Sequence, residues 1–333
     1  MKKRYLQAAS LYLLLFVGVL GCVDHELPEE QIPEPTSLTA APFANGLRFP
    51  IGMDVDDKGN LWVSEAGTGK DDGAIVMITP GGQKTTVLEG FKSAKGNEAV
   101  EGISHVLYDK GTLFILHGIE GKLYIADVSN FKAGDLPMAL NLIPFEEHGP
   151  FVKSFSFTDP LNSNLYGLTL GPDGHLYMTD AGANAIFKRD KNTKEFTFFA
   201  KIPDVAPKTD AVATGIVFDG TKFLVSTLSG GPFFENSAKI FEVSTSGVVK
   251  IYRENFTTLT HLTLTAGKKP LVISLAKFDL KLGEFTPFSG TVRNESGDVL
   301  LDNQMMPTDI KRSGPKEFYL LSYALGTVQK LTY

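Results

Sequence analysis

Short apolar runs alternate with glycine- and aspartate-containing turns from about residue 50 to the end of the chain. A repeated unit consists of a small residue, a short apolar run, a Gly/Asp turn and a stronger apolar run. Clear copies span residues 51–65, 101–117, 166–180 and 214–227, and weaker copies span 260–274 and 308–322. The second residues of successive copies are 50, 65, 48, 46 and 48 residues apart, namely Gly52, Gly102, Gly167, Gly215, His261 and Asp309.

Further β-rich runs lie between the copies, for example at 74–78, 84–88, 185–189 and 195–199. Each copy therefore predicts four short antiparallel strands. Four-stranded units repeated every 40–50 residues are typical of a β-propeller. We expect an all-β, six-bladed β-propeller over residues 36–333, in one domain because a propeller closes only as a ring.

The last copy has room for only three strands before the chain ends at residue 333. The missing outer strand should come from residues 36–40, just before the first copy. We therefore expect the last blade to be closed by an N-terminal strand.

Two longer segments interrupt the repeat. The 65-residue step contains an insertion within 131–164, and an apolar loop at 278–288 interrupts the fifth blade. We expect the insertion to cross one mouth of the ring. The alternative is that these long segments have no binding role. Long loops on a rigid scaffold often carry binding sites.

The N-terminus predicts export and lipid attachment. Residues 1–4 (MKKR) are basic, residues 11–20 are apolar, and the run ends Val19-Leu-Gly-Cys22 at the single cysteine of the chain. This ending resembles the bacterial lipobox, in which the cysteine is acylated and the preceding signal is removed. We expect a signal peptide at 1–21, an acidic, proline-rich tether at 22–35, and a lipid bilayer as partner through acylated Cys22. A plain signal peptide and a buried free cysteine are the alternatives, and the membrane leaflet stays open.

Composition narrows the possible functions. The 33 glycines fit many turns, and a formal charge of -6 argues against nucleic acid as a partner. A single cysteine excludes an intrachain disulfide and any site built from several cysteines.

Three blades resemble one family in detail. Residues 50–52 (PIG), 61–73 (LWVSEAGTGKDDG), 79–82 (TPGG), 173–186 (DGHLYMTDAGANAI) and 226–233 (STLSGGPF) are similar to motifs of the ScyD/ScyE family. This family is related to the NHL and SMP-30/gluconolactonase-like propellers. The resemblance covers roughly residues 43–333 and implies a six-bladed propeller in an extracytoplasmic protein. Blades five and six depart from it, because His261 and Asp309 replace the usual small residue.

The gluconolactonase-like relatives imply a test for metal chemistry. They place acidic and amide ligands for calcium or zinc just before the small residue of each inner strand. The matching positions here are Ile51, Glu101, Tyr166, Thr214, Thr260 and Thr308, and only Glu101 is a carboxylate. We therefore expect no metal site and no cofactor, with calcium as the alternative if Asp180 and Asn184 turn inward.

The same positions define the candidate binding site at the mouth of the channel. Its residues are Glu101, Tyr166, Thr214, Thr260, His261, Thr308 and Asp309. We assign no catalytic residue and expect a membrane-anchored, non-catalytic module of the bacterial cell envelope that binds a protein or a small-molecule ligand. Structural filling of the channel is the alternative reading of these residues. The alternative function is a gluconolactonase-like hydrolase, or an enzyme that processes secondary metabolites in the central channel.

Overall fold

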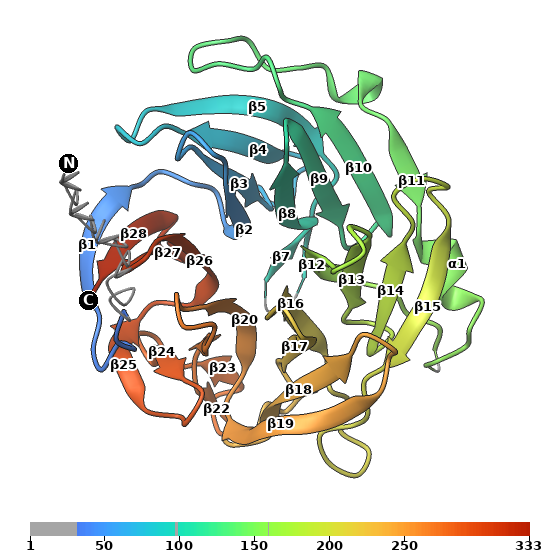
Figure 1. Ribbon diagram of the computed structural model, residues 1–333, viewed down its shortest axis with the longest axis vertical. Coiled ribbons are helices and arrows are strands. Elements are labelled where there is room, and N and C mark those ends of the chain that lie inside the picture. The colour runs from blue at the N-terminus through green and yellow to red at the C-terminus, as the bar shows by residue number, and fades with distance from the viewer. Residues whose placement is uncertain (1–31, 97–98, 159) are drawn as a thin grey trace, which may run out of the picture. The chain divides into compact units, whose positions relative to one another are not determined.

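A computed structural model describes residues 32–333, apart from 97–98 and 159. Six four-stranded antiparallel sheets are arranged in a ring (Figure 1). Each inner strand contacts the inner strands of the two neighbouring sheets, and the last sheet contacts the first. The structure confirms the expected six-bladed β-propeller.

The strands of blades 1 to 3 run from the inside of the ring outward in chain order. Blade 1 consists of β2 (Pro50–Val55), β3 (Leu61–Glu65), β4 (Gly73–Ile78) and β5 (Lys84–Phe91). Blade 2 consists of β8 (Ile103–Asp109), β9 (Thr112–His117), β10 (Lys122–Asp127) and β11 (Phe145–Glu147). Blade 3 consists of β12 (Leu165–Leu170), β13 (Leu176–Asp180), β14 (Ala185–Arg189) and β15 (Phe196–Lys201).

Blades 4 to 6 follow the same order. Blade 4 consists of β16 (Ala213–Phe218), β17 (Lys222–Thr227), β18 (Ala238–Ser244) and β19 (Val249–Phe256). Blade 5 consists of β20 (Leu259–Leu264), β21 (Pro270–Ser274), β24 (Gly290–Asn294) and β25 (Val299–Gln304). Blade 6 contains β26 (Pro307–Gly314), β27 (Glu317–Ser322) and β28 (Thr327–Thr332).

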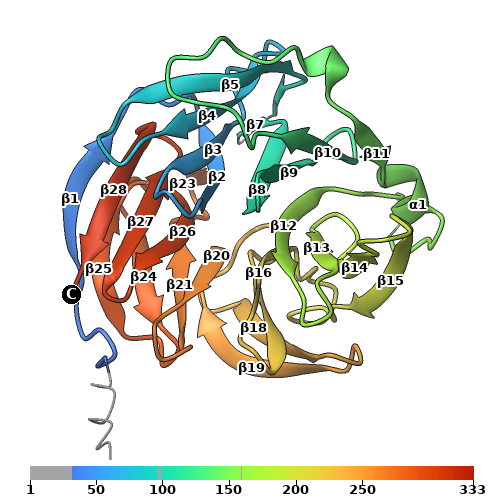
Figure 2. The same cartoon turned by 45° about the horizontal axis from the view of Figure 1, so that its top comes forward.

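The N-terminal strand closes blade 6. Strand β1 (Thr39–Ala44) pairs antiparallel with β28, with Thr39 opposite Thr332 and Ala40 opposite Leu331. Figure 2 shows β1 at the outer edge of this blade. The closure is confirmed, and the paired segment begins three residues later than the start of the predicted range 36–40.

The hydrophobic core is divided among the six interfaces between blades. One cluster of buried apolar side chains lies at each interface, because successive residues of a strand face opposite neighbouring blades. Between blades 1 and 2, for example, Trp62 and Ile75 pack with Ile103 and Leu113. The other five interfaces are filled in the same way. Burial on both faces explains the nearly continuous apolar runs of strands such as β3 and β4.

Most of the insertion at 131–164 runs along the outside of the ring and not across a mouth as expected (Figure 1), whereas Asn164 at its end lines the axial cavity described below. It supplies the outer strand β11 of blade 2, a 3-10 turn η1 (Leu140–Leu142) that contacts β5, and the short helix α1 (Gly149–Lys153). Val152 and Phe151 of this segment pack with Phe187 on β14. Met138, Leu140 and Ile143 also pack against the cluster between blades 1 and 2, and these contacts favour the outer path.

The predicted signal peptide at 1–21, Cys22 and most of the predicted tether lie outside the described residues. Within the residues that the structure describes, no helix has the length and apolar character needed to cross a bilayer.

Candidate functional site

Two rings of residues surround the axis of the propeller, at a break in regular pairing near the start of every inner strand. The first ring consists of the first residue of each break: Ile51, Ser104, Tyr166, Thr214, Thr260 and Thr308. The second ring consists of the following residue: Gly52, His105, Gly167, Gly215, His261 and Asp309. These registers place equivalent residues of all six blades around one axis.

The structure corrects the predicted register of blade 2. Ser104 and His105 occupy the two ring positions that the repeat assigned to Glu101 and Gly102. Glu101 lies instead on β7 (Val100–Glu101), which pairs with β6 (Ala94–Lys95) in a separate two-stranded sheet. Because this small hairpin uses Val100 and Glu101, the inner strand starts only at Ile103.

Spacing within the repeat could have revealed this shift. The second-ring residue precedes the start of the next apolar run by nine residues in blades 1 and 3 and by eight in blade 4. Gly102 precedes Leu113 by eleven residues, whereas His105 precedes it by eight. The outlying spacing was therefore the signal that the match at Gly102 was out of register.

Hydroxyl groups of the first ring connect neighbouring blades. The side chains of Thr214, Thr260 and Thr308 donate to the carbonyl oxygens of Leu259 at 2.9 Å, Pro307 at 3.0 Å and Pro50 at 3.0 Å, respectively. Ser104 donates in the same way to the carbonyl of Leu165 at 2.8 Å. Three of the predicted site residues therefore hold inner strands together, which supports the structural reading of these hydroxyls.

The six positions of the second ring are of two kinds, glycine in three blades and a polar side chain in the other three. Where it has glycine, the next strand supplies a hydroxyl that accepts the glycine N–H: Ser64 for Gly52 at 3.0 Å, Thr179 for Gly167 at 2.9 Å and Ser226 for Gly215 at 3.0 Å. Where it has His105, His261 or Asp309, the equivalent residue is Leu116, Ile273 or Leu321. Blades 1, 3 and 4 thus leave space near the axis, and blades 2, 5 and 6 fill it with polar side chains.

These polar side chains meet at the axis as a His–His–Asp cluster, formed by His105, His261 and Asp309. The two imidazole rings stack with centroids 4.6 Å apart. Nδ1 of His261 lies 2.9 Å from Oδ1 of Asp309, and Nε2 of His105 lies 3.9 Å from Oδ2. All three residues are buried. The sequence placed His261 and Asp309 together and missed His105, because the register of blade 2 was shifted.

The glycines of the second ring make this stacking possible. A Cβ on Gly52 would lie 2.8 Å from atoms of the His105 ring, and a Cβ on Gly215 would lie 2.8 Å from Cδ2 of His261. Such contacts are too short for any side chain other than hydrogen.

Burial and charge set the protonation of the cluster. Burial lowers the pKa of His105 to about 3, and His261 adds to this effect. Burial opposes ionisation of Asp309, yet His261, His105 and the N–H of Met53, 2.7 Å from Oδ2, together lower its pKa to about 2. Asp309 is therefore a buried carboxylate beside a neutral imidazole at physiological pH.

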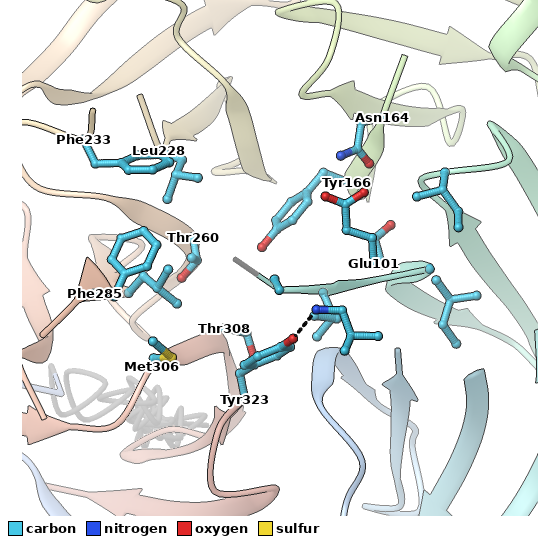
Figure 3. Close-up of a pocket in the computed structure, with 18 residues that line it drawn as sticks. Glu101, Asn164, Tyr166, Leu228, Phe233, Thr260, Phe285, Met306, Thr308 and Tyr323 are labelled. Atoms are coloured by element: carbon cyan, nitrogen blue, oxygen red, sulfur yellow. Dashed lines mark hydrogen bonds between the residues drawn. The ribbon is translucent and has the colours of Figure 1, made fainter. Parts of the chain in front are cut away.

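A cavity of about 450 Å³ lies at one mouth of the channel, next to the first ring (Figure 3). Four of the predicted site residues line it, namely Glu101, Tyr166, Thr260 and Thr308. The other three, Thr214, His261 and Asp309, are absent from the described lining of this cavity. Its walls are largely apolar and include Leu228 and Met306.

Aromatic side chains from the loops form one side of this mouth cavity. Phe285 comes from β23 (Glu284–Phe285), which pairs with β22 (Phe278–Asp279) in the predicted apolar loop of blade 5. The rings of Phe233 and Phe285 are 5.2 Å apart. On another side, the hydroxyl of Tyr323 accepts the N–H of Val100 at 2.7 Å and thereby fixes the strand that carries Glu101 (Figure 3).

Asp180 and Asn184, the two residues that would serve as calcium ligands if they turned inward, instead make hydrogen bonds in the loops of blade 3. Asp180 accepts the N–H groups of Asn164 at 2.8 Å and Ala183 at 2.9 Å. Asn184 donates to Asp210 at 3.0 Å and accepts the N–H of Val212 at 2.6 Å. Their oxygens therefore support loop conformation.

No family model matches the sequence, and no curated protein matches it. Solved structures do resemble it in fold. A Bacteroides thetaiotaomicron protein of unknown function has 11% identity and a TM-score of 0.60, with 89% of this chain and 76% of that chain covered. A putative gluconolactonase has 14% identity and a TM-score of 0.56, with 92% and 95% covered.

Virginiamycin B lyase from Staphylococcus aureus has 14% identity and a TM-score of 0.50, with 89% of this chain and 99% of the lyase covered. At such identities the likeness establishes the β-propeller architecture and nothing finer.

Proposed function

We propose that this chain is a lipid-anchored, extracytoplasmic β-propeller of the bacterial cell envelope that binds a small molecule in the mouth cavity. The cavity carries this proposal, because its volume of about 450 Å³ lies in the range of small-molecule sites. Its lining combines apolar and aromatic walls with a few polar groups, as ligand sites commonly do. The similarity of blades 1, 3 and 4 to the ScyD/ScyE family supports the extracytoplasmic placement.

The lining indicates the chemistry of the ligand. Phe233, Phe285 and Tyr323 offer ring surfaces for an aromatic or flat apolar body. Glu101 is the single charged side chain among the described lining residues, and Figure 3 shows it beside Asn164 and Tyr166. A carboxylate and a carbonyl oxygen accept hydrogen bonds, so we infer that the ligand presents an amine or another donor to this end of the cavity.

Calorimetry with a panel of aromatic amines and the matching aromatic carboxylates tests this proposal. We expect amines to bind and carboxylates not to bind, since Glu101 repels an anion. Glu101→Gln should weaken the binding of an amine about tenfold, as expected for a charged hydrogen bond worth about 1.5 kcal/mol. Phe285→Ala should weaken amines and neutral aromatic probes alike.

The control is Glu235→Gln, which changes an exposed carboxylate outside the cavity lining. Failure of every aromatic probe to bind the wild-type chain would overturn the proposed ligand class, and equal binding of amines and carboxylates would overturn the role of Glu101.

An enzymatic function is the second candidate, supported by the similarity in fold to a putative gluconolactonase and to virginiamycin B lyase. Incubation with a panel of aromatic and sugar lactones separates the two. Turnover by the wild-type chain that disappears in Glu101→Gln would favour the enzyme over the binding module.

Lipid anchoring rests on Cys22 at the end of the apolar run of the signal sequence. Cys22→Ala should move the protein from the membrane fraction to the soluble fraction of a bacterial host. Unchanged partitioning of this variant would contradict the anchor.

A further inference from the structure

The His–His–Asp cluster contains three polar atoms that have no well-oriented hydrogen bond. They are Nε2 of His105, Nδ1 of His261 and Oδ1 of Asp309, and each is fully buried. A buried polar atom left without a partner costs about 1–3 kcal/mol, and more when it is charged. Nδ1 of His261 and Oδ1 of Asp309 lie 2.9 Å from each other, whereas Nε2 of His105 has no hydrogen-bond partner, so a single ion between the three side chains would satisfy all three atoms.

Their separations fit ligation of one ion. One donor atom from each side chain can be chosen so that all three lie within 4.8 Å of one another. His261 Nδ1 and Asp309 Oδ1 are 2.9 Å apart. In a tetrahedral zinc site with bonds near 2.0–2.1 Å, neighbouring ligand atoms are about 3.3 Å apart. The three side chains therefore lie close enough for one ion to bridge them after the stacked imidazole rings rotate apart.

The outer hydrogen bonds of the cluster orient two of these side chains. Nδ1 of His105 lies 2.9 Å from the carbonyl oxygen of Tyr166 and donates to it. The other ring nitrogen, Nε2, therefore carries a lone pair that can accept a ligand at the axis. The N–H of Met53 holds Oδ2 of Asp309 at 2.7 Å, so Oδ1 faces Nδ1 of His261. Metal-binding histidines typically donate their second ring nitrogen to a carbonyl or carboxylate in this way.

The local charge also favours a cation. Asp309 is the carboxylate of the cluster, and Lys311, which interacts with it electrostatically, forms its ion pair with Asp54 at 2.7 Å. A buried carboxylate without a compensating charge is strongly unfavourable.

We propose that His105, His261 and Asp309 bind one divalent transition-metal ion of the zinc class at the axis of the propeller. Two imidazole nitrogens and one carboxylate oxygen are a ligand set that such ions prefer. The site belongs to the second ring. It therefore differs from the first ring, whose positions match the metal ligands of the gluconolactonase-like propellers.

The ion would connect blades 2, 5 and 6 through one point. Thr260 and Thr308, which precede two of the ligands, line the mouth cavity. A metal at the cluster would therefore stabilise the ring and the inner end of the cavity together. The alternative is a metal-free ion pair between His261 and Asp309.

The experiment uses chain purified without metal-affinity chromatography, stripped with a chelator and dialysed. Titration with Zn²⁺ should show one equivalent bound per chain by elemental analysis and should raise the melting temperature by several degrees. Titration with Co²⁺ should produce visible ligand-field absorption of a protein-bound ion with nitrogen ligands, a readout that needs no variant.

His105→Gln and His261→Gln should each weaken binding at least about 100-fold, which exceeds the usual loss from changing an outer-shell partner. The matched control is His175→Gln, because His175 lies near two exposed-loop carboxylates, at 3.3 Å from Asp190 and 3.8 Å from Asp173, where adventitious binding could occur. Glu101→Gln should bind the metal normally, which separates this site from the proposed ligand site.

No Zn²⁺-dependent shift of the wild-type melting temperature, together with no cobalt absorption, would overturn the proposal in favour of the ion pair. Loss of the bound equivalent in His175→Gln alone would also overturn it.

Discussion

His148 shows how strongly a single buried side chain can depend on its surroundings. Its imidazole, at the start of α1 in the insertion, is fully buried, and both ring nitrogens lack a partner among the described residues. It packs edge-on against Phe187 at 5.0 Å and Phe196 at 4.6 Å. Burial lowers its pKa from 6.5 to about 3, so the native state holds it neutral.

This depressed pKa predicts acid sensitivity. Between about pH 6.5 and pH 3 the unfolded chain binds a proton that the folded chain does not, so stability decreases as pH falls. The contribution of His148 is about 1.4 kcal/mol per pH unit within that window. His148→Leu should flatten the decrease by this amount and leave stability at pH 7 equal or higher.

Urea unfolding at several pH values between 4 and 7 measures the effect. His148→Gln serves as the control, because it removes the titration and keeps a buried polar group. An unchanged pH slope in both variants would rule out the assigned role of His148.

Gly215 is a position near the axis where only glycine leaves room for the neighbouring His261. Gly215→Ala would place a Cβ 2.9 Å from the backbone Cα of His261 and 2.8 Å from its ring. We expect destabilisation of about 1–3 kcal/mol, as for other overpacked interiors. The control is Gly81→Ala, where the nearest atom to the new Cβ is 3.8 Å away. Equal denaturant midpoints for the two variants would contradict the packing argument.

At the scale of elements, the first-ring hydroxyls act as connectors between inner strands. Thr308 on β26 donates across the last interface to the carbonyl of Pro50 on β2, so it links the two ends of the blade series. Thr308→Val keeps the shape and removes the donor. We expect a loss of about 1–2 kcal/mol, because the hydroxyl is replaced and a buried carbonyl loses a partner.

Thr332→Val provides the comparison, since Thr332 lies at the end of β28, away from the axis, and is exposed. Chemical denaturation of both variants is the measurement, and similar midpoints would show that the connector contributes nothing.

The inner strands also show why strand identity was easier to predict than strand register. Apolar runs flanked by turns predicted β2, β12 and β16 directly. In blade 2 the run at 101–107 contained two overlapping choices, and the glycine at 102 resembled the small residue of the other copies. Pairing with β9 decided between them, because Ile103 lies opposite His117. Register depends on a partner strand, which a local pattern does not contain.

At the scale of the whole molecule, one strand from the beginning of the chain completes the ring. Strand β1 supplies the outer edge of blade 6, and Leu38 packs in the cluster between blades 5 and 6 while its N–H donates to the carbonyl of Leu300. A chain starting at residue 46 should therefore lose cooperative unfolding or become insoluble, since blade 6 would expose a free edge.

A chain starting at residue 32 keeps β1 and Leu38 and should unfold as the wild type does. Thermal unfolding followed by circular dichroism compares the two truncations. Equal melting temperatures would show that closure by β1 is dispensable.

The sequence by itself determined the number of blades, their strand content and the closure by an N-terminal strand. These features follow from the local periodicity of apolar residues and from the number of turns, and both can be found from neighbouring residues in the sequence. Only the tertiary structure decided that His105 joins His261 and Asp309 and that Glu101 reaches the mouth cavity from β7 and not from an inner strand. The physical reason is convergence: residues far apart in the chain meet at the axis according to strand register, and register is set by pairing between strands.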